Sequence, residues 1–196
     1  MIWRVRRVLT GHDAEGRSTI IADGFAANMK EMPAGSGLAV TELWETSVPA
    51  DNAGRQDAGN RNVRLEPPQN GTLFRIVEFP PDSQWQNRPD ARDWAKALDA
   101  THAPDRSSSD PMMHKTNTVD YIVVLKGEIY AILDKGETLL KPGDVFIQRG
   151  TNHSWSVRGS EPCVIGVVLV NAKPLSFGKK KLASKKPAAK KAKKKK

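Results

Sequence analysis

The sequence predicts an all-β protein, built as an antiparallel sandwich or barrel and followed by a basic tail. Three observations carry this prediction. Short runs of β-forming residues recur along most of the chain, tight-turn signals separate them at even spacing, and only one segment has helical periodicity. The length of 196 residues suits one domain, and an apolar fraction of 38% is enough for a sizeable core.

The first stretch, residues 1–111, contains four predicted strands, a long polar loop and a short helix. The strands read RVRRVLTG, STIIADG, GLAVTELWETS and GTLFRIVEFPP, and we expect them to contribute to the barrel. The loop PADNAGRQDAGNRNVRLEPPQNG is long for a compact domain, and loops of this length often have a function. We expect it either to cover a pocket mouth or to reach a partner subunit.

The single predicted helix lies within residues 90–100, which read DARDWAKALDA. Trp94, Ala97 and Leu98 recur at the i, i+3 and i+4 positions of one helical face. Pro89 stands just before this segment, where proline suits a helix start.

Residues 112–175 form the predicted barrel core. Its β-type runs are TVDYIVVL, EIYAIL, ETLL, VFIQ, HSWSVRG and CVIGVVLVNA. A glycine stands in each of four turns between them, where a tight turn needs a positive φ. These glycines are Gly127, Gly136, Gly143 and Gly150. We expect the segment from Met112 to Asn171 to build a ligand or metal pocket.

The tail, residues 176–196, cannot form a core, and we expect it to be disordered on its own. Eleven lysines lie between Lys179 and Lys196, so the net charge of +9 belongs to the tail, and residues 1–178 carry 20 basic and 22 acidic side chains. The tail either binds nucleic-acid phosphates weakly and non-specifically through residues 179–196, or it is a solubilising extension.

The cysteine count and the hydropathy pattern indicate the compartment. Cys163 is the only cysteine, which excludes a disulfide scaffold and a cysteine-based zinc cluster. The first residues lack the apolar core of a secretory signal, and no run approaches 18 apolar residues. We therefore expect a cytoplasmic protein without a membrane span, and we interpret Cys163 as a small apolar filler of the core.

Polar side chains share one face of two predicted core strands, because every second side chain of a strand points the same way. The first set is His114, Thr116, Thr118 and Asp120. In a later strand His153 shares its face with Trp155. A barrel can bring both sets together inside. Two imidazoles and a carboxylate suit a divalent metal, and the arrangement is typical of iron(II), with zinc or manganese also fitting.

These residues carry a resemblance to the cupin superfamily. The first cupin motif is H-x-H, three or four residues, Glu, six residues and Gly, and this chain reads His114-Lys-Thr116-Asn-Thr-Val-Asp120, then six residues and Gly127. The second motif is G-x5-P-x-G-x2-H, and this chain reads Gly143-DVFI-Gln148-Arg-Gly150-Thr-Asn-His153. Thr116 replaces a motif histidine, Asp120 replaces glutamate and Gln148 replaces proline.

The resemblance extends over residues 1–175, because the TGHD start and the TELW and FRIVEFPP strands are similar to those of a subgroup of small bacterial and fungal cupins. It implies a cupin-type antiparallel β-barrel (a double-stranded β-helix or jelly roll) that holds a small molecule. It also implies His114, Asp120 and His153 as metal ligands and catalytic residues. Four further side chains are candidate substrate contacts: Thr116, Thr118, Gln148 and Trp155.

Each candidate also has a plainer interpretation. His114 and His153 can be hydrogen-bonded barrel histidines, and Asp120 can support a histidine instead of binding the metal. The aromatic residues Trp155, Tyr121 and Tyr130 more often fill a core than stack on a substrate. His12 and His102 are interpreted as ordinary surface residues.

Three functions remain open at this point. The first is a metal-dependent enzyme acting on a small organic molecule as an oxygenase, isomerase, lyase or decarboxylase. The second is a metal-free small-molecule-binding or sensor protein, which Thr116 in place of histidine favours. The third is a nucleic-acid-associated cupin that works through its tail. Early strands and open barrel edges also make a homodimer an expectation.

Overall fold

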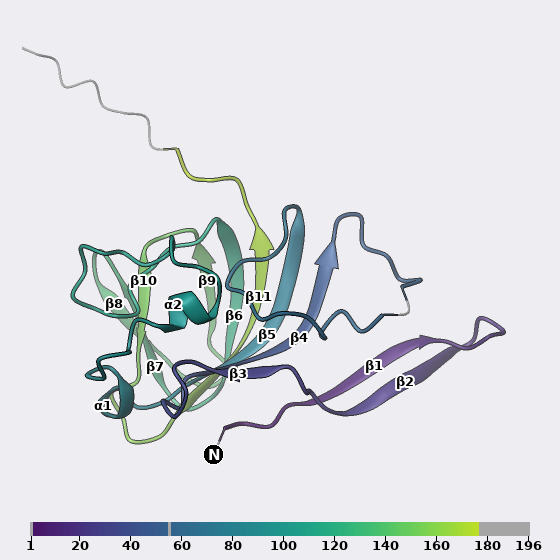
Figure 1. Cartoon of the computed structure of the whole chain (residues 1–196), viewed down its shortest axis with the longest axis horizontal. Coiled ribbons are helices and arrows are strands. Elements are labelled where there is room, and N and C mark those ends of the chain that lie inside the picture. Colours follow the sequence, from purple (N-terminus) through teal and green to yellow (C-terminus); the bar gives the residue numbers. More distant parts are fainter. Residues whose placement is uncertain (1, 55, 177–196) are drawn as a thin grey trace, which may run out of the picture.

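A computed structural model describes residues 2–54 and 56–176, and in it the chain forms two facing antiparallel sheets and a projecting hairpin (Figure 1). The prediction of an antiparallel all-β architecture is confirmed. The predictions made for the tail at residues 179–196 fall outside the described residues.

The larger sheet has six strands in the order β3-β4-β5-β11-β6-β9. Their bounds are Met29–Glu31 (β3), Ala39–Ser47 (β4), Gly71–Phe79 (β5), Cys163–Asn171 (β11), Thr118–Lys126 (β6) and Val145–Arg149 (β9). The smaller sheet has the order β10-β7-β8, with bounds His153–Ser156 (β10), Ile129–Leu133 (β7) and Glu137–Leu140 (β8). Every pairing in both sheets is antiparallel.

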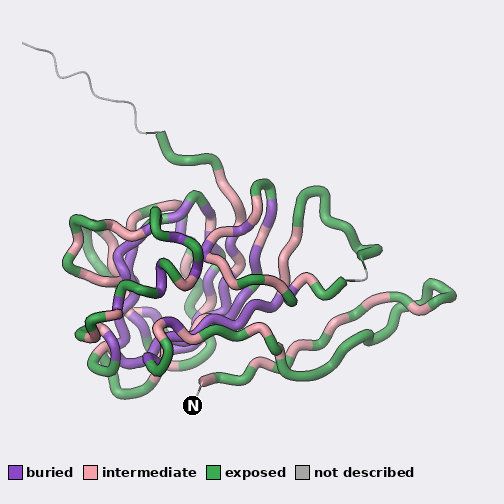
Figure 2. The backbone as a smooth tube through the Cα atoms, in the orientation of Figure 1, coloured by how far each residue is buried: buried purple, intermediate pink, exposed green. Residues whose placement is uncertain are grey.

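The core lies between the two sheets, and Figure 2 shows the buried residues gathered there. Apolar residues at alternate positions of the strands point inward, because side chains alternate between the faces of a sheet. Leu73, Ile122, Ile129 and Leu169 are examples from four strands, all buried. Trp155 of β10 packs between two phenylalanine rings at centroid distances of 5.7 and 6.0 Å, which closes one end of this core.

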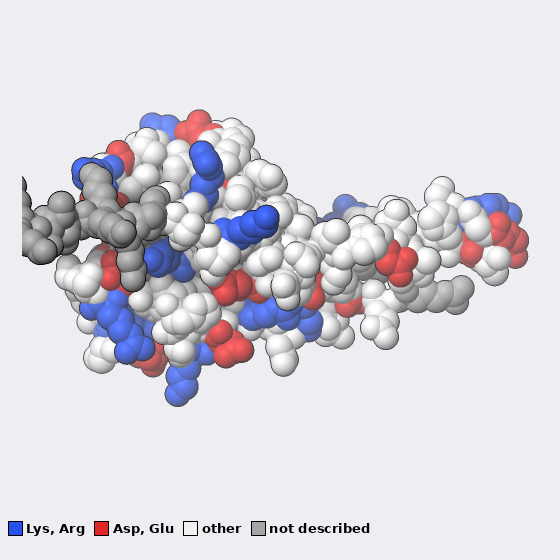
Figure 3. Space-filling model, turned by 90° about the horizontal axis from the view of Figure 1, so that it is seen from above, with Lys and Arg blue, Asp and Glu red and all other residues white. Residues whose placement is uncertain are grey.

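The strands β1 (Arg6–His12) and β2 (Ser18–Phe25) form a separate two-stranded sheet that projects from the barrel (Figure 1). We expected all four early strands to contribute to the barrel. The strands β4 and β5 do so, whereas β1 and β2 form a sheet of their own. The reason lies in the side chains, since every residue of β2 is exposed and buries nothing against the barrel. Figure 3 shows charges of both signs at the far end of this hairpin, where Arg17 pairs with Asp13.

Helical structure is limited to two single turns, α1 (Asp82–Trp85) and α2 (Trp94–Ala97). The predicted helix in residues 90–100 is therefore shorter than its periodicity indicates, because Asp99 adopts a left-handed φ of 52°, which ends the turn. Neither of the helices in the described residues has the length and apolar character needed to cross a bilayer.

The four turn glycines predicted to have positive φ do so, with values between 59° and 91°. Gly127 shows most clearly why glycine is needed. A Cβ atom there would lie 2.4 Å from the carbonyl oxygen of Pro162, so any side chain would collide with the backbone that leads into β11.

Candidate functional site

Two histidines from distant parts of the sequence lie together inside the barrel. His153 begins β10, and His114 forms an isolated bridge with it through two backbone hydrogen bonds of 2.8 and 2.9 Å. Their ring centroids are 4.2 Å apart, and both side chains are buried. The bridge holds the rings against each other without a continuous strand through His114.

Backbone carbonyls define which ring nitrogen of each histidine carries the proton. Nδ1 of His114 lies 2.6 Å from the carbonyl oxygen of Met112, and Nδ1 of His153 lies 3.0 Å from that of Thr151. A carbonyl oxygen only accepts hydrogen bonds, so Nδ1 must donate in both rings. Nε2 of each neutral imidazole therefore keeps a free lone pair.

Burial also makes both imidazoles neutral near pH 7. Removal from water lowers the pKa of His114. Burial, followed by the neighbouring His114 ring, lowers the pKa of His153 well below its usual value. Two positive charges at this distance would repel in a medium of low dielectric constant, so the pair holds at most one extra proton. The pair is thus a proton acceptor at neutral pH.

Both histidines line a cavity of about 90 Å³ between the sheets. Its other polar walls are Asp120 and Arg75, and its remaining lining is apolar. An engineered cavity of about 150 Å³ holds benzene, so the space here corresponds to a molecule smaller than a benzene ring.

Residues from loops and from α2 complete the lining of this cavity. Trp94 packs at 5.0 Å against the ring of His114 and donates from Nε1 to the carbonyl of Pro111. Leu65 lies in the long polar loop, lines the cavity and donates its backbone N–H to the carbonyl oxygen of Leu98.

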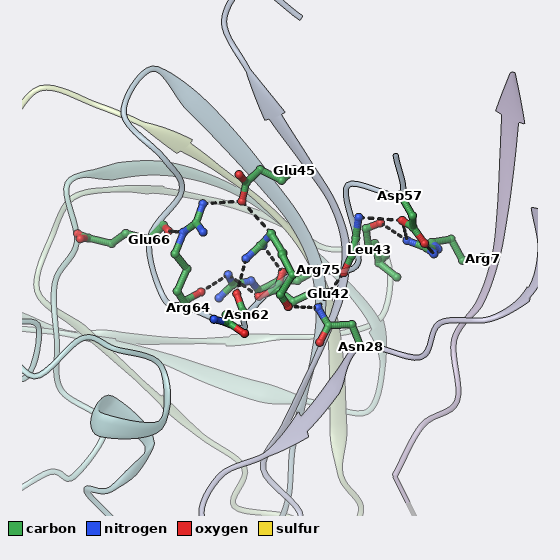
Figure 4. Close-up of polar contacts among 12 residues, drawn as sticks. Arg7, Asn28, Glu42, Leu43, Glu45, Asp57, Asn62, Arg64, Glu66 and Arg75 are labelled. Atoms are coloured by element: carbon green, nitrogen blue, oxygen red, sulfur yellow. Dashed lines mark hydrogen bonds and ion pairs between the residues drawn. The ribbon is translucent and has the colours of Figure 1, made fainter. Parts of the chain in front are cut away.

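Arg75 connects the cavity to a network of ion pairs, named here the ionic cluster: Glu42, Glu45, Arg61, Arg64 and Arg75. Figure 4 shows Glu42, Glu45, Arg64 and Arg75 side by side. Arg75 and Glu42 are fully buried on neighbouring strands, with Nη2 and Oε1 2.9 Å apart. Burial raises the pKa of Glu42, and the surrounding guanidinium groups oppose that shift. The cluster joins the barrel interior to the polar loop that carries Arg61 and Arg64.

Asp120 of β6 is the third polar wall of the cavity. Burial raises its pKa to about 6, while a hydrogen bond from Thr118 and the charge of Arg75 oppose the increase and Glu66 adds to it. Its Oδ1 atom is buried and has no hydrogen-bond partner among the residues that the structure describes. The carboxyl group therefore changes protonation close to neutral pH.

The predicted three-residue metal set is not assembled. Within residues 2–54 and 56–176, no three His, Cys, Asp or Glu side chains lie together in a way that would hold a metal ion. His114 and His153 meet at β10 of the small sheet, whereas Asp120 lies on β6 of the large sheet and faces Arg75. The chain leaves the β-conformation at residues 115–117, so strand parity does not carry from His114 to Asp120. Metal binding by the two histidines stays a prediction.

The predicted substrate contacts divide into two groups. Trp155 lines the cavity beside His153, with ring centroids 5.7 Å apart. Thr116, Thr118 and Gln148 are buried but do not line it. The two threonine hydroxyls bond each other at 2.6 Å, and Gln148 donates to the carbonyl of Thr151 at 2.9 Å. These three side chains support the wall.

Arg75 is the residue of the cavity that the sequence analysis missed. A signal for it exists, because Arg75 has the strand parity of Leu73, Val77 and Phe79, which are inward apolar positions. Tyr121 has the opposite parity to Asp120 and is half exposed, so it makes no contact with the site.

Two facing antiparallel sheets enclose a cavity with a few polar groups, and cavities of this kind are common sites for small molecules. A family model described as the cupin domain matches residues 99–170. The phomopsin biosynthesis cluster protein C' of Diaporthe leptostromiformis is 31% identical over 186 residues, which cover 90% of this chain and 83% of that protein. This chain belongs to the cupin family.

Two further similarities are to a curated protein and a solved structure. The cupin-domain-containing oxidoreductase virC of Hypocrea virens is 27% identical over 179 residues, covering 88% of this chain and 78% of that protein. The cupin domain of Schizosaccharomyces pombe Cnp3 is 11% identical, covers 86% of this chain and 89% of that chain, and gives a TM-score of 0.43.

Proposed function

We propose that this cupin is an enzyme that removes a proton from a small organic molecule enclosed in its barrel. The observation that carries the proposal is the pair of neutral imidazoles, whose Nδ1 atoms are occupied by backbone carbonyls at 2.6 and 3.0 Å. Two Nε2 lone pairs are then available in a cavity of about 90 Å³. An imidazole that is unprotonated at pH 7 and already oriented can act as a general base.

The proposed step moves one proton and changes no oxidation state. A C–H proton next to a carbonyl group passes to Nε2 of His153 or His114, which leaves an enolate and one imidazolium. The proton then returns to carbon or to another atom of the substrate. The second imidazole accepts a hydrogen bond from the imidazolium, and this stabilises a single positive charge on the pair.

Proton removal beside a carbonyl is an early step of isomerisation, dehydration and several oxidations. Relatives with oxidoreductase in their names cover most of this chain, which supports an enzyme over a binding protein. The reaction that follows proton removal depends on the substrate.

Deuterium exchange tests the proposal. The protein is incubated in D₂O with acetone, propanal and pyruvate in turn, and deuterium at the carbon next to the carbonyl is followed by NMR. We expect exchange with at least one of these compounds, reduced about 100-fold or more in His114→Gln and His153→Gln. No exchange with any of the three by the wild-type protein would refute the proposed function.

The chain contains its own controls for these variants. His12 and His102 are exposed and distant from the cavity lining, so His12→Gln and His102→Gln should exchange like the wild type. Equal losses in all four variants would show that the effect is not specific to the cavity pair.

A metal-dependent enzyme is the second candidate, since two Nε2 lone pairs are two of the ligands that a divalent metal takes. Iron, manganese or zinc bound there would act as a Lewis acid on the substrate. Elemental analysis and EDTA treatment separate the candidates. Exchange that is lost with EDTA and restored by one of these metals would favour the metal-dependent enzyme over the metal-free base.

A further inference from the structure

We propose that the molecule held in the barrel is a short organic anion whose carboxylate binds Arg75, opposite the imidazole pair. The inference rests on the proposed function, which places an acidic C–H group of the same molecule at the two histidines. It adds the substrate class, a small oxo acid or a comparable carboxylate with an apolar body.

The first reason is the position of Arg75. Its side chain is buried, lines the cavity and lies on β5, which forms the wall together with β11 and β6. Nη2 donates to the carbonyl oxygen of Arg64 at 2.5 Å and lies 2.9 Å from Oε1 of Glu42. Both contacts are made by Nη2.

The second reason is the unfilled hydrogen-bonding capacity of the same group. Nε of Arg75 is buried without a hydrogen-bond partner in the described part of the chain. Oε1 of Glu42 likewise has no aligned donor there, although it lies within ion-pair distance of Arg75. A buried guanidinium donor without a partner is costly, and a carboxylate is the acceptor that matches its planar donor edge.

The third reason is the charge balance of the ionic cluster. It contains three arginines and two glutamates, so one positive charge is left over. Asp120 is the carboxyl group that faces this excess from the cavity. Glu66 also acts on Asp120, but His102 and the backbone N–H of Asn117 engage it at 3.2 Å, outside the cavity lining. A ligand carboxylate would balance the cluster whenever Asp120 is neutral.

The remaining walls of the cavity match the rest of such a molecule. Apolar side chains make up most of the remaining lining, and these include Val77, Val167 and Leu169. A carboxylate, a short apolar body and an acidic C–H group complement this combination of a guanidinium, apolar side chains and two imidazoles. The volume of about 90 Å³ favours an anion smaller than benzene.

Propanoate and propanamide, which have the same shape and differ in charge, test the inference by NMR titration of the full chain. We expect saturable binding of propanoate, about tenfold or more tighter than that of propanamide, because a charge-assisted contact to a buried guanidinium is lost in the amide. Asp120→Asn removes the competing negative charge, so it should tighten propanoate binding and leave propanamide unchanged.

The double variant Arg75→Gln/Glu42→Gln removes a positive and a negative charge together, so the cluster keeps its net charge while the proposed anchor is lost. It should bind propanoate and propanamide equally. Arg158→Gln is the matched control, because Arg158 is exposed and pairs with Glu137 away from the cavity. Equal or weaker binding of propanoate than of propanamide by the wild type would overturn the inference, as would weaker propanoate binding by Asp120→Asn.

The two proposals fail separately. Exchange of acetone or propanal with no preference for propanoate would leave the histidine base in place and remove the anion site. A clear propanoate preference without deuterium exchange of any carbonyl compound would keep the Arg75 site and remove the proposed function.

Discussion

The two polar walls of the cavity both contain buried groups, but they carry different charges. At the imidazole pair, burial outweighs the charge of Asp110, which acts on His114, so the pKa values of both rings are lowered and the rings are neutral. In the ionic cluster each guanidinium has a carboxylate within 2.9 Å, and these partner charges oppose the pKa shifts that burial causes in Glu42 and Arg75. Burial alone therefore does not decide ionisation, and the presence of a partner does.

The largest effect is expected from breaking the ionic wall at Arg75. Arg75→Met removes one of the two guanidinium groups that pair with the buried Glu42 carboxylate, the other being that of Arg61, and we expect the free energy of unfolding to fall by about 3–5 kcal/mol. Urea denaturation followed by tryptophan fluorescence measures this loss.

A second substitution at Glu42 shows whether the stability loss in Arg75→Met comes from an unpaired carboxylate or from lost packing. Arg75→Met/Glu42→Gln removes both charges, so it should recover much of the stability that Arg75→Met loses. If the double variant were as unstable as the single one, the carboxylate of Glu42 would not be the source of the loss.

A smaller effect is expected from Asp120, which lies between the two walls. Its folded-state pKa of about 6 is raised above the unfolded value, so Asp120 favours the folded state at low pH and this contribution is lost as the pH rises through 6. Asp120→Asn should therefore stabilise the protein at pH 8, by up to about 2–3 kcal/mol. The gain should disappear near pH 3, below the unfolded pKa of about 3.9, where the wild-type carboxyl group is protonated in both states. A stability difference independent of pH would contradict this account.

The imidazole wall has the opposite dependence on pH. Folded-state pKa values below those of the unfolded chain mean that stability is lost as the pH falls through about 6.5, where the unfolded histidines take up protons. When the pH is lowered from 7 to 5.5, the free energy of unfolding should decrease in both proteins, and the decrease should be smaller in His153→Gln than in the wild type by on the order of 1 kcal/mol. Urea denaturation over this pH range tests the difference, and the exposed His102→Gln should follow the wild type.

Local signals in the sequence predicted much of the barrel. Ten of the strands coincide with predicted β-runs. These predictions succeed because a period-two pattern and a turn glycine can each be recognised within a few consecutive residues. The short strand β3 was not predicted, since Met29–Glu31 is too brief to show a period. The residues of β1 and β2 are typical of strands, but local sequence patterns do not indicate whether these two strands join the barrel or form a separate hairpin.

The site was predicted in part, for a related reason. Strand parity correctly put His153, Trp155 and Asp120 inside, because that rule operates within one strand. Whether Asp120 meets the histidines depends on the order of strands in two sheets, which parity does not contain. Arg75 was missed because charged side chains are usually exposed, although its position among Leu73, Val77 and Phe79 marks it as inward.

The smallest effect is expected at an ion pair with similar geometry and a different environment. Arg6 and Asp23 of the projecting hairpin are 2.7 Å apart, closer than Arg75 and Glu42, but their side chains are 67% and 41% exposed. Water solvates either charge when its partner is removed, so Arg6→Gln and Asp23→Asn should leave the urea midpoint unchanged within experimental scatter. A midpoint shift comparable to that of Arg75→Met would mean that the hairpin is buried against another surface in solution, and the contrast between buried and exposed pairs would then no longer hold.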